Sequence, residues 1–420
     1  MSSLSERLKA LGVKVGTADL PSGRGPGQRE WPAGEGTTIA SVLSGELMST
    51  PAGVTFVHEE RFAAEYHHGR APIHLSASLH SVAAWARDPR LGALPIESFA
   101  FLDTETSGLA GGTGTYAFLV GAGRFSGGEF ILQQFFMQDP SEEPALLEGL
   151  ARFLAPAQAL VTFNGKAFDA PLLKTRYILH SIPSPFMDFA HLDLLPLARR
   201  LWRDRLPSRA LKYLEENILQ APRTADEVPG YEIPWLYFDY LRSGDARPLK
   251  GVFYHNAMDV VAMAALLNHT ASMLADPFHE GIQHGLDVIA LARLYEDLGQ
   301  VETAARLFER GLEMDLVEGD FWKAVGRLSV LQKRRGDYEQ AVRLWEKSAA
   351  QGHVYAHVEL AKYHEHQLHD IRAAIRWTKS ALKCARARDL PKYERLHWQE
   401  QLEHRLQRLE KKAGRRKTDL

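Results

Sequence analysis

The sequence predicts an α/β domain, in which a mixed sheet is flanked by helices, followed by an all-helical domain. Two observations predict this class. Three closely spaced apolar runs precede an alternation of helical and strand patterns, which is typical of an α/β sandwich. After about residue 276 the strand patterns end and helical segments of similar sequence recur. A length of 420 residues leaves room for two or three domains.

An N-terminal extension over residues 1–95 is predicted to precede the α/β domain, which spans 96–272. The extension contains a stretch rich in Gly and Pro, 21–36, that predicts a loop. Its remaining short strands and turns favour a packing extension of the next domain over a functional unit of its own.

The α/β domain begins with three predicted strands that form an antiparallel meander, at 99–102, 116–121 and 130–137. A helical pattern follows as far as Phe153, with Ser141 as its expected cap and Glu142 and Glu143 at the positive end of its dipole. A fourth strand is predicted at 159–163 and a further helix at 171–179.

The C-terminal domain, 280–410, contains three related segments that begin at Gly299, Gly336 and His369. Their aligned alanines are 37 and 33 residues apart, at Ala304, Ala341 and Ala374. These spacings are similar to the 34-residue period of tetratricopeptide repeats, which stack helical hairpins. A small residue at this position lets paired helices approach closely. Such arrays commonly bind proteins, and a basic tail is expected at 411–420.

Composition excludes several classes of protein. The formal net charge of −2 argues against a polycation that coats nucleic acid, and one cysteine, Cys384, excludes an internal disulfide framework. No run of about 18 apolar residues predicts a membrane span, and the first residues lack the apolar core of a secretory signal. We therefore expect a cytoplasmic protein without a membrane partner.

Asp103 and Glu105 follow the first predicted strand as Asp-Thr-Glu. Side chains at positions i and i+2 of a strand share a face, so the two carboxylates repel each other unless a cation lies between them. Hard divalent cations prefer such oxygen ligands. Two exposed acids in a turn are the alternative, and for this pair taken alone the alternative is favoured.

Two further acidic residues lie in informative surroundings. Asp169 ends the stretch Asn-Gly-Lys-Ala-Phe-Asp after the fourth strand, where it is either a site residue or the cap of the next helix. In the same stretch, Asn164 is expected in a turn and Phe168 in the core. His255 and Asp259 share one face of an apolar helical segment, where a simple hydrogen-bonded pair is the alternative to a site.

Together and in this order, these patterns resemble the three motifs of the DEDD exonuclease superfamily, which has a ribonuclease-H-like fold. The blocks DTETSGL, LVTFNGKAFDAPLLKTR, HLDLLPLARRLWRDRL and FYHNAMDVVAM are similar to the bacterial YprB-type domain of that fold, over roughly residues 96–270. The better-known exonucleases place a His five residues, or a Tyr four residues, before the last Asp. Here His255 is four before it and Tyr254 is five before it.

The resemblance implies a metal-dependent nuclease that hydrolyses DNA or RNA, with 3′→5′ exonuclease activity as the expected form. Two divalent ions, Mg²⁺ or Mn²⁺, would be held by four carboxylates, Asp103, Glu105, Asp169 and Asp259. Either His255 or Tyr254 would serve the attacking water. His255 is favoured, because an ordinary histidine pKa near 6.5 suits a general base near neutrality.

Basic and polar residues near these motifs are candidates for binding the substrate. Arg199, Arg200 and Arg203 lie in a basic cluster that could neutralise phosphates, or could form a solvated helix face. Asn164 and Lys166 lie at the second motif. Asp193 is expected to cap a helix or to support the metal ligands without binding the metal itself. The competing hypothesis is an adaptor without catalysis, which binds nucleic acid through the α/β domain and proteins through the repeats.

Overall fold

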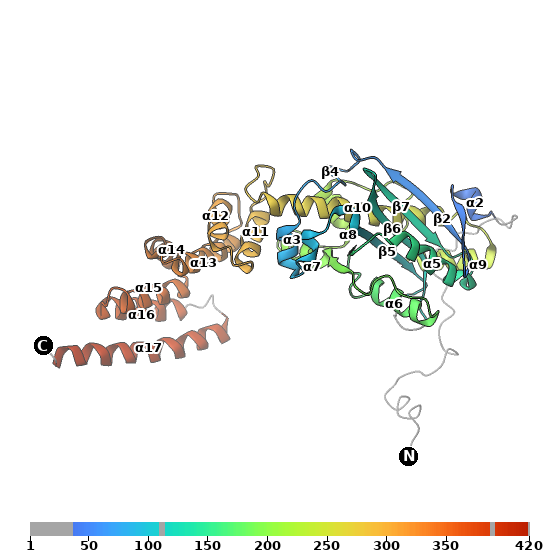
Figure 1. Ribbon diagram of the computed structural model, residues 1–420. Coiled ribbons are helices and arrows are strands. Elements are labelled where there is room, and N and C mark those ends of the chain that lie inside the picture. The colour runs from blue at the N-terminus through green and yellow to red at the C-terminus, as the bar shows by residue number, and fades with distance from the viewer. Residues whose placement is uncertain (1–36, 109–113, 387–390, 419–420) are drawn as a thin grey trace, which may run out of the picture.

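A computed structural model gives the structure of residues 37–108, 114–386 and 391–418. The predicted loop at 21–36 lies outside these residues. Within them, seven strands form one mixed sheet in the spatial order β1-β2-β7-β6-β5-β8-β9 (Figure 1). These strands, in chain order, span Glu46–Thr50, Gly53–Phe62, Phe99–Thr106, Ala117–Ser126, Glu129–Phe136, Ala159–Thr162 and Ala190–Asp193.

The predicted meander is confirmed, because β5, β6 and β7 pair antiparallel in sequence order. β8 and β9 extend the sheet in parallel from β5. β1 and β2, which come from the predicted N-terminal extension, extend the opposite edge, with β2 pairing antiparallel to β7. This extension therefore supplies part of the central sheet.

Alternation along β5 places a hydrophobic core on each face of the sheet. Phe99 and Phe101 contact the core on one face, and Ala100 and Leu102 contact the core on the other. Several helices pack onto these cores (Figure 1). They are α3 (His80–Ala86), α5 (Glu143–Leu154), α6 (Asp169–Leu179), α7 (Leu194–Trp202), α9 (Ile233–Ser243) and α10 (Leu249–Ala275).

The helix α10 is the longest apolar helix of the sheet domain. Among the described residues it alone has the length and hydropathy of a membrane-spanning helix, and 78% of its most apolar window is buried inside the protein. It packs against β5, β6 and β7. Its apolar character is therefore explained by its place in the core.

One local expectation differs from the structure. Ser141 does not cap the helix α5. Instead, Asp139 accepts a hydrogen bond from the Ser141 backbone N–H and starts a short 3₁₀ turn, Pro140–Glu142, that leads into α5. Near the C-terminus, the predicted basic tail is helical as far as Thr418, because it is part of the helix α17 (Lys392–Thr418).

A run of helices follows the sheet domain and forms an elongated arm (Figure 1). The three related segments begin at equivalent turns, since Gly299, Gly336 and His369 all have positive φ angles of 55–81°. The aligned alanines Ala304, Ala341 and Ala374 are fully buried. The helices α11 to α17 span Gly285–Asp297, Val301–Leu312, Glu318–Arg334, Tyr338–Ala350, Val354–His366, Ile371–Ala385 and Lys392–Thr418.

Candidate active site

Asp103 and Glu105 lie near the end of the central strand β5. Burial, together with the negative charges of Asp259, Glu105 and Asp169, raises the pKa of Asp103 well above its ordinary value. Burial also raises the pKa of Glu105 to about 7, with Asp259 and Asp169 adding to the shift and His255 opposing it. Because the charges of Asp169 and Asp259 act on both Asp103 and Glu105, we refer to the four residues together as the carboxylate cluster: Asp103, Glu105, Asp169 and Asp259.

Asn256, on α10, holds Asp103 in place. Its side-chain Nδ2 donates a hydrogen bond to Asp103 Oδ2 at 2.9 Å, and its Oδ1 accepts one from Gln134 Nε2 at 2.9 Å. Gly121 pairs with Asp103 across the sheet and leaves room for this amide, because a Cβ at Gly121 would lie 2.2 Å from Asn256 Oδ1. The sheet and α10 are thus joined directly at the cluster.

Asp169 begins the helix α6 and faces β5. The hydroxyl of Thr104 donates a hydrogen bond to Asp169 Oδ1 at 2.5 Å. Burial raises the pKa of Asp169 to about 6, although its hydrogen bonds oppose the shift. The preceding turn places Asn164 at a φ of 70° and is fixed by Asp193, which accepts hydrogen bonds from the backbone N–H groups of Asn164, Lys166 and Leu195. Asp193 therefore caps α7 and holds this turn.

His255 and Asp259 lie one turn apart on α10, with His255 Nε2 3.6 Å from Asp259 Oδ2. The other ring nitrogen, Nδ1, is 3.0 Å from Glu227 Oε1. Burial lowers the pKa of His255, but the hydrogen bond to Glu227 and the charges of Asp259 and Glu105 outweigh it and raise the pKa to about 9. The imidazole is therefore protonated at neutral pH here, in contrast to the ordinary pKa assumed from the sequence. The hydroxyl of Tyr254 accepts a hydrogen bond from the Thr224 backbone N–H at 3.0 Å.

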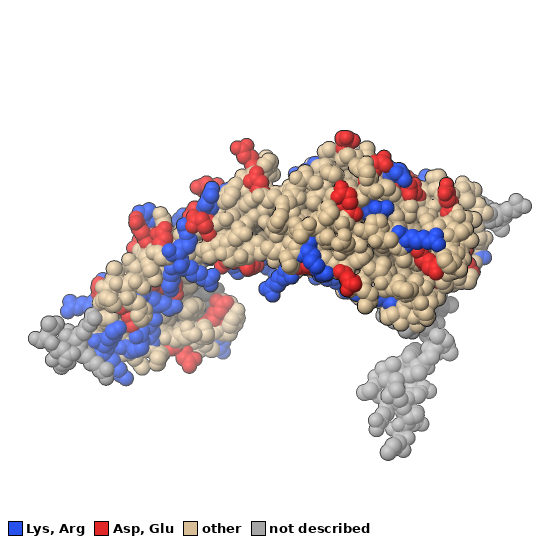
Figure 2. Space-filling model, viewed as in Figure 1, with Lys and Arg blue, Asp and Glu red and all other residues tan. Residues whose placement is uncertain are grey.

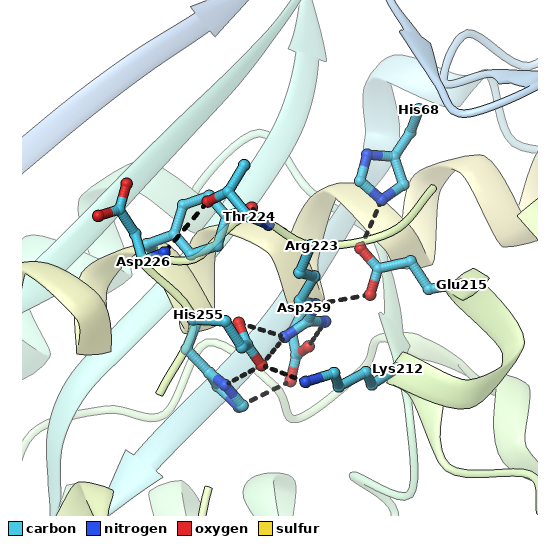
Figure 3. A network of polar contacts seen from close by, with 10 residues as sticks. His68, Lys212, Glu215, Arg223, Thr224, Asp226, His255 and Asp259 are labelled. Carbon is cyan, nitrogen blue, oxygen red and sulfur yellow. Dashed lines mark hydrogen bonds and ion pairs between the residues drawn. The ribbon is translucent and has the colours of Figure 1, made fainter. Parts of the chain in front are cut away.

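A buried arginine joins Asp259 to two further carboxylates (Figure 3). The Arg223 side chain is 1% exposed, and its guanidinium contacts Glu215, Glu227 and Asp259. Glu215 is contacted in turn by His68, from the strand β3 (His67–His68) of the N-terminal extension, with His68 Nε2 2.7 Å from Glu215 Oε1. The network therefore connects the N-terminal extension to the carboxylate cluster.

The donor set of the cluster is of the kind that a hard divalent cation prefers, because the four side chains offer carboxylate oxygens whose negative charge helps to raise the pKa of Asp103 and Glu105. Protein groups hold one oxygen each of Asp103, Asp169 and Asp259. Among the residues with described placement, no three His, Cys, Asp or Glu side chains lie so that they could hold a metal ion.

The predicted substrate-binding residues lie at several places. Lys166 is exposed beside the second motif, and Arg199 is exposed on α7. Arg200 and Arg203 contact aspartates outside the cluster: Arg200 Nη2 is 2.5 Å from Asp297 Oδ2 on α11, and Arg203 Nε is 3.5 Å from Asp204 Oδ1. On the face seen in Figure 2, Lys and Arg side chains gather over the helical arm, whereas both signs of charge are spread over the sheet domain.

Several residues of the site differ from the expectation or were missed. Phe168 was expected in the core, but 59% of it is exposed, directly before Asp169. No role was predicted for Glu227, Arg223, Glu215 or His68, because each is connected to the site through contacts between residues far apart in the sequence. A signal was present for Asn256, since its buried amide lies between His255 and Asp259 on an apolar helix.

Comparison with known proteins agrees with this fold. Residues 100–271 match the RNase H superfamily. The solved family B DNA polymerase of the hyperthermophilic archaeon Pyrobaculum calidifontis is 16% identical, with a TM-score of 0.32, over 50% of this chain and 28% of the polymerase. The uncharacterized protein YprB of Bacillus subtilis strain 168 is 36% identical over 304 residues, which cover 71% of this chain and 72% of YprB. The chain therefore belongs to the YprB family, with an RNase H superfamily domain as its α/β core.

Proposed function

We propose that this protein is a metal-dependent nuclease that hydrolyses phosphodiester bonds of DNA or RNA, acting as a 3′→5′ exonuclease. The observation that carries the proposal is the proximity of four half-buried to buried carboxylates, in which the negative charges of Asp169 and Asp259 raise the pKa of Asp103 and Glu105. A polyvalent cation would relieve this repulsion. The RNase H superfamily fold implies nucleic-acid binding and suggests a nuclease. We place this activity in the cytoplasm.

The four carboxylates are the proposed ligands of two divalent ions, Mg²⁺ or Mn²⁺. When bound, such a pair supplies charge that activates a water and stabilises the leaving oxygen of an in-line displacement. The protein contributes the alignment: Asn256 and Thr104 fix Asp103 and Asp169, and Glu227 fixes the ring of His255. His255 is the proposed residue that orients the attacking water and takes its proton.

The pKa of His255 sets a condition on that role. A histidine with a pKa of about 9 is already protonated at neutral pH and cannot accept a further proton. Because the charges of Asp259 and Glu105 raise this pKa, compensation of those charges would return it toward neutrality. His255 is therefore proposed to act as a base only when the carboxylate charge is compensated.

Substrate binding is proposed for exposed groups around the cluster. Lys166 and Asn164 lie at the turn before Asp169, and the exposed ring of Phe168 adjoins it. Aromatic rings of this kind stack on nucleobases. Arg199, Arg200 and Arg203 are proposed phosphate contacts along α7, and the helical arm is proposed to be a tetratricopeptide-type array that binds a protein partner.

A second function, an adaptor that binds nucleic acid without cutting it, is favoured by two observations. Arg223 already contacts Asp259, and among the described residues no three His, Cys, Asp or Glu side chains could hold a metal ion. In that case the cluster would be neutralised by the protein itself. A cleavage assay distinguishes the two functions.

The test incubates the full-length protein with end-labelled single- and double-stranded DNA and RNA, in Mn²⁺, Mg²⁺ or chelator. We expect cleavage only with a divalent cation, with shortening from the 3′ end, and its loss in Asp103→Asn. Asp88→Asn, which removes an exposed acid paired with Arg90, is the matched control and should cut like the parent. Binding without cleavage in every condition would instead establish the adaptor.

A further inference from the structure

A long groove runs along one side of the helical arm. Its first part, of about 1120 Å³, lies between the end of α7, the helices α11 and α13, and the start of α15. Its second part, of about 500 Å³, lies between α13, α15 and α17. Val330 and Tyr355 line both parts, so the two are continuous. We call the whole the arm groove, and within the arm its lining comes from alternate helices together with the turn before α15.

Basic side chains outnumber acidic ones in the arm groove. Its lining includes seven Lys and Arg side chains against four Asp and Glu side chains. Two of these acids are each contacted by two basic side chains: Glu296 by Arg327 and Arg334, and Glu359 by Lys333 and Lys362. The protein itself therefore compensates these carboxylates, and a surplus of positive charge remains for an occupant. Figure 2 likewise shows Lys and Arg side chains gathered over the arm.

Aromatic rings lie among these charges. Trp322 on α13, Tyr355 on α15 and Trp398 on α17 line the arm groove and are half-buried. Next to them, the side chain of Lys323 is 71% exposed and that of Arg327 is 51% exposed. A positive groove with aromatic rings suits a single strand of nucleic acid, because cations neutralise its phosphates and rings stack on its unpaired bases.

The arm groove begins at the sheet domain. Arg203 directly follows α7 and lines the groove, and Arg200 on α7 contacts Asp297 on α11. At the other end of α7 lies its cap, Asp193, which also holds the turn before Asp169. The nine residues of α7 span about 14 Å, which about four stacked nucleotides would cover. One short helix therefore leads from the turn beside the carboxylate cluster to the start of the groove.

We propose that the arm groove binds a single strand of nucleic acid, so that the arm holds the part of a long strand that extends beyond the sheet domain. This inference rests on the proposed function, since it takes the sheet domain to bind nucleic acid. An acidic segment of a protein would also fit the charge, but continuity with α7 favours the nucleic acid. The protein partner proposed for the arm would then bind at its other surfaces.

The experiment measures the affinity of the full-length protein for labelled single strands of about 8 and about 30 nucleotides, as DNA and as RNA, by fluorescence anisotropy in chelator. The parent should bind the long strand at least about tenfold more tightly than the short one. Lys323→Glu combined with Arg327→Glu should weaken binding of the long strand by at least about tenfold and lower its slope against log salt by about 1–2. Binding of the short strand should weaken less, because it does not reach far along the arm.

The control and a neutral substitution make the comparison specific. Arg343→Glu combined with Lys379→Glu reverses two exposed charges on α14 and α16, neither of which is among the described lining residues. It changes the net charge equally and should retain most of the affinity for the long strand. Trp322→Leu removes a ring without changing charge and should weaken binding of the long strand by on the order of tenfold, whereas Trp322→Phe should retain most of it. Melting temperatures check that each variant is folded.

The possible results differ for the arm groove and for the proposed function. A parent that binds neither strand contradicts the proposed function itself. A parent that binds both lengths equally, or a Lys323→Glu and Arg327→Glu variant that binds like the control, overturns the role of the groove and leaves the nuclease proposal standing. A labelled polyglutamate peptide that binds the parent but not this variant, while both bind the long strand equally, would assign the groove to an acidic protein segment instead.

Discussion

Asn256 donates a hydrogen bond to the carboxylate of Asp103 at 2.9 Å, although 153 positions separate the two residues in the chain. This bond ties the last helix of the sheet domain to its central strand at the point where four carboxylates meet. Because an amide is neutral, it orients Asp103 without compensating its charge. The site is therefore held in shape by the fold while it remains electrostatically unsatisfied.

The first prediction concerns the cost of that unsatisfied charge. Asp103→Asn removes a half-buried carboxylate whose pKa is raised by desolvation and by the charges of its neighbours, so the metal-free variant should be more stable than the parent. A gain of about 1 kcal/mol would raise the melting temperature by about 2–4 °C. Calorimetry in chelator checks this, and a lower melting temperature would show that Asp103 stabilises the fold.

The second prediction is the pH dependence of stability without metal. Glu105 and Asp169 have pKa values of about 7 and 6 in the folded protein, above their ordinary values of 4.5 and 3.8. At these two groups the folded state then binds more protons than the unfolded state between about pH 4 and 7, so their contribution to stability falls as the pH rises through that window. His255 acts in the same direction between its ordinary pKa of 6.5 and about 9, since its protonated form is the one that the fold favours.

Melting temperatures in chelator across this range provide the measurement. Glu105→Gln should flatten the slope below pH 7, and His255→Gln should flatten it above. Saturating Mn²⁺ should reverse the trend, because ionised ligands bind the cation more tightly. The parent's net slope also includes His191 and His269, whose lowered pKa values act in the opposite direction below about pH 6.5, so the comparison with the two variants is decisive. A slope that neither variant changes would contradict the assigned charges.

The third prediction tests the close approach at Gly121. In Gly121→Ala the new methyl would lie 2.2 Å from Asn256 Oδ1, so the amide must move away from Asp103. We expect a loss of about 1–3 kcal/mol of stability and a loss of cleavage beyond what the unfolded fraction explains. Gly319→Ala is the control, because its added methyl meets nothing within 4 Å. Equal activity of the two variants would show that the position of Asn256 beside Asp103 is not needed for cleavage.

The fourth prediction concerns the exposed ring beside the cluster. Phe168→Ala should weaken binding of single-stranded nucleic acid by about 1–3 kcal/mol, since a stacked base loses its aromatic partner. Stability should change little, because the ring is 59% exposed. Ile178→Ala, at a residue 75% exposed on the same helix, is the comparison. Similar affinities for both variants would show that Phe168 is a surface residue that does not contribute to nucleic-acid binding.

The fifth prediction examines the basic residues of α7. Arg200→Glu combined with Arg203→Glu should reduce the slope of log affinity against log salt by about 2, one for each lost phosphate contact. Both arginines contact aspartates, so the variant must also be checked for folding. Arg242→Glu, an exposed arginine paired with Asp239, is the control. An unchanged slope would exclude this face from the substrate path.

The sequence was sufficient for the elements that follow from local periodicity. Alternation placed Asp103 and Glu105 on one strand face, and helical spacing placed His255 over Asp259. Gathering them with Asp169 required the family resemblance, because a single sequence gives the order of strands along the chain and not in space. Short strands were predicted in the N-terminal extension, but their place in the central sheet was not, for the same reason, since β2 pairs with β7 across the intervening chain.

The arginine network shows where sequence reasoning stops. Arg223 lies in a polar stretch with neither helical nor strand periodicity, and its contact with Asp259 spans 36 positions. Nothing local distinguishes it from an exposed loop residue. The raised pKa of His255 could not be predicted from the sequence either, because it depends on Glu227 and on charges that the fold brings together.

The most direct test of the proposed metal site is a crystal structure of the full-length protein with Mn²⁺, with data collected at the manganese absorption edge. We predict anomalous peaks within coordinating distance of the four carboxylates, Asp103, Glu105, Asp169 and Asp259. In the same crystals of Asp103→Asn these peaks should be weaker. A parent structure at saturating Mn²⁺ without an anomalous peak among these four carboxylates would contradict the proposal that they bind divalent cations.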